Sequence, residues 1–294
     1  MIANNGQELK DICLKEGISI WEYTLKAEAK KSKISEEEVF NKMKAVLEVM
    51  KASAKKGLNE KVISVSSLIG GDAYKLNEYS KKESLTGSFM NKAMARALSS
   101  SEVNAAMGKI VAAPTAGSCG IMPAVIISAA EKLNKNEDDM VRALLSASTI
   151  GNIISTNATV SGAEGGCQAE CGSAAAMACA GIVEMMGGSV EQALDGAAIV
   201  IKNILGLVCD PVAGLVEIPC AKRNVAGTVS ALTTADIVMA GITSHIPFDD
   251  TVEAMFEVGK SLPCALRETA LGGVAITKAG KLLEEKVFGK KDTL

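Results

Sequence analysis

Apolar residues recur along this chain at the spacing of helices. After Ser35 they fall three or four residues apart, on one helix face: Val39, Phe40, Met43, Val46, Leu47 and Met50. A serine followed three residues later by Glu or Gln predicts helix starts at Ser19, Ser35 and Ser189. Further helical patterns cover residues 19–31, 88–107, 138–155, 172–186, 190–205, 224–242 and 250–262. Strand candidates are few, so the pattern predicts an all-α protein.

Glycines mark the expected ends of several helices, at Gly108, Gly187 and Gly206. No internal repeat or low-complexity linker divides the chain. We therefore expect a single compact multi-helix domain over residues 81–294, with a small N-terminal helical portion, residues 1–80, packed on it.

Composition limits the partners and the compartment. Of the 294 residues 48% are hydrophobic and 22% charged, and the formal net charge of −3 gives no electrostatic reason to expect nucleic acid or a membrane surface as partner. Charged residues interrupt the three richest apolar runs, and Met1–Lys10 lacks the apolar core of a signal peptide. We expect a cytoplasmic protein, whose eight cysteines indicate metal binding or catalysis more than disulfides.

Three of the cysteines lie among glycines or prolines where helices should begin or end. Cys167 precedes the helix expected from Gly172, Cys209 follows the helix expected to end at Gly206, and Cys220 precedes the helix expected from Asn224. Their separations match neither zinc-finger nor ferredoxin spacing. Thiols on helix-terminal loops could nevertheless meet at one point without breaking any helix.

The alternative is that these cysteines are small buried apolar residues, as free cysteines commonly are. That interpretation suits Cys13 and Cys179, which lie on apolar helix faces. It suits the three loop cysteines poorly, because side chains in loops are seldom buried. Cys171 could be a ligand or the first buried residue of its helix, and we favour the second.

A loop of small residues, Thr115, Ala116, Gly117 and Ser118, precedes a helix expected near Ile121. Its backbone N–H groups and two hydroxyls would suit a substrate carboxylate, although an ordinary helix cap has the same pattern. Asn157 is a weaker substrate-binding candidate. No side chain stands out as a catalytic base, and Lys109 and Glu164 are weak candidates for one.

Other polar residues receive secondary roles. Three glutamates flank the cysteines: Glu164, Glu170 and Glu217. We favour a role in hydrogen bonding around the site or in helix capping, and proton transfer is the minor hypothesis. Arg267 could bind a carboxylate through two hydrogen bonds, or form a surface ion pair. His245 is expected to have a structural or solvent-exposed role.

Several long motifs resemble one known family. They are 165–170 (GGCQAE), 207–216 (LVCDPVAGLV), 218–220 (IPC), 112–121 (AAPTAGSCGI), 70–74 (GGDAY) and 266–273 (LRETALGG). Over nearly its whole length the chain resembles the alpha subunit of iron–sulfur-dependent L-serine dehydratases. The resemblance implies a 4Fe-4S cluster on Cys167, Cys209 and Cys220, with the fourth iron left for substrate.

The resemblance also implies an activity and a partner. The activity is a lyase reaction that converts L-serine to pyruvate and ammonia, with an open iron acting as Lewis acid on the substrate hydroxyl and without pyridoxal phosphate (PLP). A separate beta subunit is implied and could supply the base. The chain ends Asp292-Thr293-Leu294, so the C-terminal cysteine that enters the active site in some fused relatives is not expected here.

Two other functions stay open at this stage. L-cysteine desulfuration is one, because a thiolate would leave from the same carbon. A non-catalytic iron–sulfur or zinc protein, serving as redox sensor or scaffold, belongs to a different class.

Overall fold

Helix α9 (Ser173–Met185) lies at the centre of the molecule and consists mainly of small residues. All of its side chains except that of Glu184 are buried, as expected for a helix that is apolar on every side. Helices α6, α7, α10 and α11 pack around it. At Gly181 a Cβ would lie 2.6 Å from the carbonyl oxygen of Ala143 on α7, so the two backbones are in direct contact.

The computed structural model describes residues 3–289. Within this range the chain forms thirteen α-helices: α1 Gly6–Glu16, α2 Ile20–Ser32, α3 Glu36–Asn59, α4 Asp72–Tyr79, α5 Gly87–Ala105, α6 Ile121–Leu133, α7 Glu137–Asn157, α8 Gly162–Gly165, α9 Ser173–Met185, α10 Val190–Ile204, α11 Cys220–Met239, α12 Phe248–Ser261 and α13 Lys278–Phe288. Five short helical segments complete the described part: η1 Ala116–Ser118, η2 Gln168–Gly172, η3 Val212–Gly214, η4 Cys264–Leu266 and η5 Gly273–Ile276. Two isolated β-bridges, Ile63 with Gly70 and Cys209 with Arg267, are the only β pairings in residues 3–289. The all-α prediction is confirmed.

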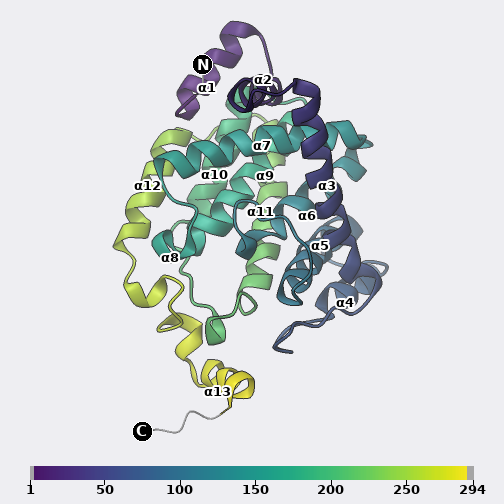
Figure 1. Ribbon diagram of the computed structural model, residues 1–294, viewed down its shortest axis with the longest axis vertical. Coiled ribbons are helices and arrows are strands. Elements are labelled where there is room, and N and C mark those ends of the chain that lie inside the picture. Colours follow the sequence, from purple (N-terminus) through teal and green to yellow (C-terminus); the bar gives the residue numbers. More distant parts are fainter. Residues whose placement is uncertain (1–2, 290–294) are drawn as a thin grey trace.

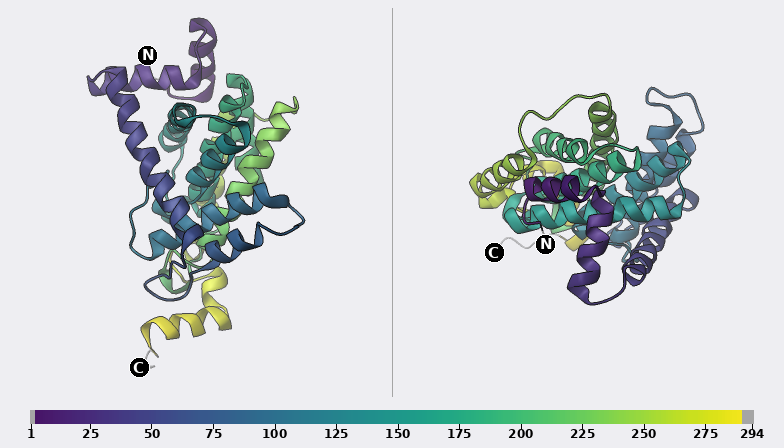
Figure 2. Two further views of the ribbon diagram at one scale, coloured as in Figure 1. Left: turned by 90° about the vertical axis from the view of Figure 1, so that its right-hand side faces the viewer. Right: turned by 90° about the horizontal axis from the view of Figure 1, so that it is seen from above.

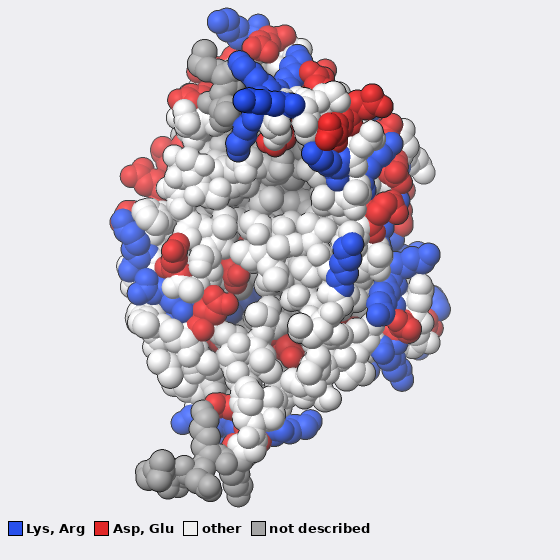
Figure 3. All heavy atoms as spheres, viewed as in Figure 1, with Lys and Arg blue, Asp and Glu red and all other residues white. Residues whose placement is uncertain are grey.

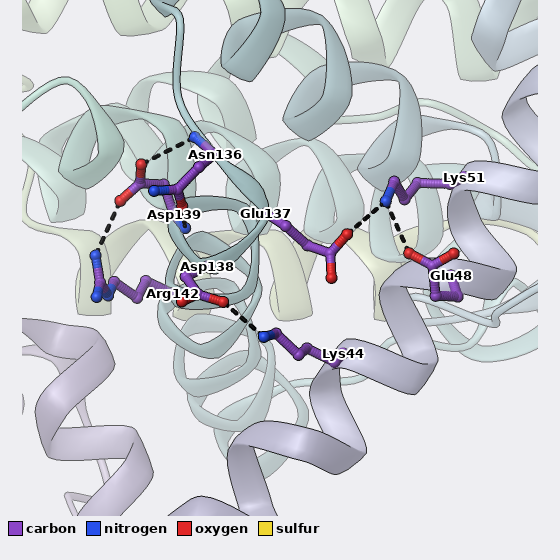
Figure 4. A network of polar contacts seen from close by, with 8 residues as sticks. All are labelled: Lys44, Glu48, Lys51, Asn136, Glu137, Asp138, Asp139 and Arg142. Atoms are coloured by element: carbon purple, nitrogen blue, oxygen red, sulfur yellow. Dashed lines mark hydrogen bonds and ion pairs between the residues drawn. The ribbon is translucent and has the colours of Figure 1, made fainter.

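The N-terminal helices cover one end and one side of the central bundle (Figures 1 and 2). Helix α2 packs on α7, and α3 packs on α5 and α7. Ion pairs join α3 to the first turn of α7, with Lys44 Nζ 2.8 Å from Asp138 and Lys51 Nζ 2.8 Å from Glu137 (Figure 4). The division at residue 80, which falls just after α4, stays a prediction.

Serine caps located three helix starts, and several other starts were shifted or missed. The predicted caps Ser19, Ser35 and Ser189 each accept a hydrogen bond from the backbone N–H three residues later. Helix α3 continues through Gly57 to Asn59, and α1, α4, α8 and α13 were not predicted. Helix α11 begins at Cys220, four residues before the predicted start.

The surface in the view of Figure 1 is largely uncharged in its middle, with acidic and basic side chains gathered around the edge (Figure 3). One described stretch, Ala116–Leu133, is long and apolar enough to cross a membrane by composition, and the sequence pattern had not singled it out. Of this stretch 67% is buried inside the protein, as in the core helix of a globular domain.

Candidate active site

Cys167 lies at the junction between the glycine-rich turn after α8 and the segment η2. The segment η2 is a π-helix, a wider turn that occurs often at functional sites. Gly166 precedes the cysteine with φ of +76°, a conformation that favours glycine. The cysteine is 2% exposed, and its Sγ lies 3.4 Å from Cys171 Sγ.

Cys209 lies in an extended segment held on both sides. Its backbone N–H donates to Leu266 O at 2.9 Å, and its carbonyl accepts from Glu268 N–H at 2.7 Å. Two residues earlier, Leu207 O accepts from Gln168 N–H at 3.0 Å, beside Cys167. The first and second loop cysteines are therefore fixed to each other through the backbone, although they are distant in sequence.

Cys220 joins the same place through Arg223, three residues further along α11. The Arg223 guanidinium donates to Val208 O at 2.8 Å and to the Asp210 carboxylate at 2.8 Å, so it binds the chain on both sides of Cys209. Cys220 is 8% exposed and Cys209 is 3% exposed. The argument that loop cysteines bury little was wrong, because surrounding helices cover all three.

The three thiols also interact electrostatically. A hydrogen bond with Cys171 and the charge of Arg223 lower the pKa of Cys167. Burial first, and then the charge of Cys167, raise the pKa of Cys220 to about 12 and raise that of Cys209 further. Three thiolates at this position would repel one another, so their joint ionisation requires added positive charge.

No three His, Cys, Asp or Glu side chains within residues 3–289 are close enough together to hold a single metal ion. The cysteines border one place without forming the tight shell that one zinc ion requires. Their donor chemistry, three thiols on three separate segments, is what an iron–sulfur cluster uses. The donor chemistry of these residues therefore fits a cluster of this kind.

The loop of Thr115–Ser118 lies against the same region and forms the short helix η1. The Asn224 side chain fixes it, because its amide donates to Gly117 O at 2.7 Å and to Cys220 O at 2.9 Å, and its oxygen accepts from Gly120 N–H at 2.9 Å. Within residues 3–289 the backbone N–H groups of Ala116 and Gly117 have no hydrogen-bond partner. Two donors are thus free beside a cysteine-lined site.

Glu170, on η2, lies between this loop and the cysteines. A Cβ placed on Gly117 would be 3.2 Å from Glu170 Oε1, and one placed on Gly162 would be 2.7 Å from Oε2 and 3.2 Å from Cys209 Sγ. Two glycines therefore make room for the carboxyl group. Burial raises the pKa of Glu170, while a hydrogen bond with Thr115 acts in the opposite direction.

The remaining sequence candidates are spread more widely. Asn157 ends α7, where its amide donates to Asn4 O and Ile153 O. Lys109 is exposed in the segment between α5 and η1, and Glu164 is exposed and hydrogen-bonded to Thr159. No hydrogen bond or ion pair within residues 3–289 joins these three side chains to a cysteine or to Thr115–Ser118.

Glu217, Arg267 and His245 also have defined surroundings. The Glu217 carboxylate, which is buried, accepts from the hydroxyls of Ser64 and Ser66 at 2.7 and 2.6 Å. Arg267 lies beside Cys209, and its buried Nε has no partner among the described residues. His245 is exposed in a turn, with its Nδ1 3.5 Å from the Thr243 hydroxyl.

Sequence reasoning missed Arg223 and Asn224 and gave Glu170 only a secondary role. Arg223 and Asn224 lie on a helix whose predicted start is too late, and nothing in the pattern sets them apart from other helix residues. Their spacing could have pointed to them. In a helix that starts at Cys220, residues three and four positions later lie on the same face as the cysteine.

The molecule is thus an all-helical protein with a site made of three buried cysteines, an arginine and a loop with free N–H groups. Its sequence matches the family described as "Serine dehydratase alpha chain" over residues 15–275. The chain belongs to this serine dehydratase alpha chain family.

Individual relatives agree with the family match. The chain is 50% identical over 292 residues to the "L-serine dehydratase, alpha chain" of Peptoniphilus asaccharolyticus, covering 99% of this chain and 100% of the relative. It is 48% identical to the "Probable L-serine dehydratase, alpha chain" of Bacillus subtilis (strain 168), covering 97% and 95%. It is 37% identical to the "L-serine dehydratase" of Streptomyces coelicolor, covering 92% of this chain but 60% of that one.

Proposed function

We propose that this chain is the alpha subunit of an iron–sulfur L-serine dehydratase, a lyase that deaminates L-serine to pyruvate and ammonia. The observation that carries the proposal is the meeting of three buried thiols, from three separate segments, beside two backbone N–H groups without partners. Relatives named L-serine dehydratase alpha chain, at 48–50% identity over nearly the whole length, support it.

Cys167, Cys209 and Cys220 would hold a 4Fe-4S cluster. Burial and the charge of Cys167 raise the pKa of Cys209 and of Cys220, which supports this assignment, because a cationic iron core supplies the charge that three neighbouring thiolates require. When bound through three cysteines, such a cluster supplies a Lewis-acidic iron with an open position for the substrate hydroxyl. Cys171 stays a thiol that hydrogen-bonds Cys167 and is not a ligand.

The loop Thr115–Ser118 would hold the substrate carboxylate. The free N–H groups of Ala116 and Gly117 can donate to its oxygens, and the hydroxyls of Thr115 and Ser118 lie 3.2 Å apart in the same loop. Asn224 keeps this loop at a fixed position relative to Cys220, so carboxylate and hydroxyl would be bound at a defined separation.

The reaction removes the Cα proton and expels hydroxide from Cβ. The resulting enamine tautomerises and takes up water, giving pyruvate and ammonia. The proposal includes no PLP, and it assigns the base to a separate beta subunit, because Lys109 and Glu164 are both exposed. The alpha-chain names of two relatives that this chain matches over nearly their whole length support a separate partner subunit. A cytoplasmic location belongs to the same proposal.

The test is anaerobic co-expression with a candidate beta subunit, followed by measurement of iron, acid-labile sulfide and pyruvate. Serine variants of Cys167, Cys209 and Cys220 are each expected to lose most bound iron and all turnover of L-serine. Cys264→Ser is the matched control, because Cys264 is exposed and lies in η4. Cys171→Ser should keep its iron.

Each outcome decides the proposal. The proposal is supported if the protein contains equal amounts of iron and sulfide and turns over L-serine, and if only the three cysteine variants lose iron and turnover. A preparation containing zinc without sulfide, or turnover that depends on added PLP, would overturn it. L-cysteine assayed in parallel separates dehydration from desulfuration.

A further inference from the structure

Glu170 is the acidic side chain that touches each part of the proposed site. Its oxygens border Gly117 in the loop with free N–H groups and Gly162 on α8, and Cys209 Sγ also borders Gly162. Glu170 is a partly buried residue. Its carboxyl group therefore lies between the loop and Cys209.

This carboxylate has no cationic partner within residues 3–289, since no lysine or arginine there forms an ion pair with it. The nearby cation, Arg223, is already bound to Asp210 and Val208. A second carboxylate belongs to Glu268, which has a left-handed φ of +63° and donates its N–H to Cys209 O. The charge of Glu268 contributes to the raised pKa of Glu170, as expected of neighbouring carboxylates.

A partly buried carboxylate without a cation is costly unless a ligand supplies the positive charge. An α-amino acid carries its ammonium group on the carbon that also carries the carboxylate. A site for such a molecule therefore needs an anion directly beside its carboxylate donors. Glu170, which borders Gly117 next to the free N–H of that residue, meets this requirement.

We propose that Glu170 binds the ammonium group of the substrate and so restricts the site to α-amino acids. The inference rests on the proposed function for the identity of the substrate. It adds a residue that determines specificity. A hydroxy acid has no ammonium group, so its carboxylate would lie beside the Glu170 carboxylate, whose charge would stay unpaired.

The experiment compares L-alanine with propanoate, which differ only in the amino group and which both lack the hydroxyl that would react. Their dissociation constants are measured by anaerobic titration calorimetry on the assembled enzyme and on Glu170→Gln. For Glu170→Gln we expect roughly 10- to 100-fold weaker binding of L-alanine, the loss of one charge-assisted hydrogen bond. Propanoate should bind equally well or more tightly, because a repulsive charge is gone.

Opposite changes for the two ligands distinguish recognition from damage, since a distorted site would weaken both. Glu170→Asp keeps the charge and should retain the preference for L-alanine in part. Glu257→Gln, which alters an exposed carboxylate on α12, is the matched control and should change neither constant. Equal weakening of both ligands, or no change in either, would overturn the proposal.

Failure of the proposed function would look different. A wild-type enzyme that discriminates L-alanine from propanoate through Glu170 but does not turn over L-serine would overturn the dehydratase assignment and leave amine recognition intact. An active dehydratase in which Glu170→Gln has no effect would overturn only the role of Glu170.

Discussion

Glu184 is a carboxylate that the fold uses to hold the start of helix α2. One oxygen accepts from Ile20 N–H at 2.6 Å and the other from Trp21 N–H at 3.3 Å and from the Ser146 hydroxyl. Positive charge at a helix start favours the ionised carboxylate. Burial opposes ionisation more strongly and raises the pKa of Glu184.

This raised pKa makes one contribution to stability depend on pH in a defined direction. The folded state binds the Glu184 proton more tightly than the unfolded chain does. The stabilisation of the fold by the protonated Glu184 side chain is therefore largest below the ordinary carboxyl pKa. It falls as pH rises through the raised pKa. We expect the stability of wild type relative to Glu184→Gln to decrease from pH 4.5 upward. Urea unfolding of both proteins across this range checks it, and a flat or rising difference would contradict it.

At the residue scale, the sequence indicated the groups that lie next to helix-breaking residues and not those that act over distance. Glycines and prolines around Cys167, Cys209 and Cys220 set these cysteines apart within the sequence itself. Asn224 carried no such mark, because its contact with Gly117 spans 107 residues of sequence. The free N–H groups of the loop could not be predicted either, since a helix cap has the same composition.

At the scale of elements, α7 and α9 approach each other closely because α9 has small side chains along its length. Gly181 marks a close approach, where a Cβ would meet Ala143 O at 2.6 Å. Gly172, at the start of the same helix, has helical backbone angles, and its nearest neighbour would be 3.9 Å from a Cβ. The two glycines provide a matched pair.

Gly181→Ala is expected to destabilise the protein by about 1–3 kcal/mol, because the added methyl group forces the two helices apart. Gly172→Ala should be neutral or stabilising by up to about 1 kcal/mol, because alanine favours a helix over glycine. Thermal unfolding of the two variants and wild type measures the difference. Equal melting temperatures for both variants would show that the helices can separate without cost.

Helix starts were predictable where a serine followed three residues later by Glu or Gln marks the cap. Local caps of another kind, Asn5 of α1 and Thr277 of α13, were missed. Ser189 caps α10 through its own side chain, as its sequence pattern predicted. Helix α4 has no side-chain cap of its own, and instead Glu102 on α5 accepts from Asp72 N–H at 2.6 Å. Helix α11 follows Pro219 without a side-chain cap, so nothing in its sequence marked Cys220 as the first residue.

At the scale of the whole molecule, the candidate site joins segments that are distant in sequence and consist largely of loops and short helical turns. The segment from Gly206 to Pro219 lies between α10 and α11 and contains only the short helix η3. Hydrogen bonds with Gln168 and Leu266, which accept, and with Arg223, which donates, fix it in place. The stability of this segment should depend on a group that links Cys167, Cys209 and Cys220. Helices α7 and α9, in contrast, are held by apolar contacts.

If Cys167, Cys209 and Cys220 hold the proposed cluster, removal of its iron by a chelator after brief oxidation should therefore loosen the protein locally. A ligand that binds only the folded state stabilises it, and losing the ligand exposes the least stable parts first. We expect faster amide hydrogen exchange over residues 206–220 and 162–172, with exchange in α7 and in the second half of α9 unchanged. The buried backbone of α9 around Cys179, a thiol outside the site, serves as internal reference. Uniform acceleration would show that the cluster supports the entire fold. No change would show that these cysteines hold nothing the folded state needs, which would contradict a cluster bound by them.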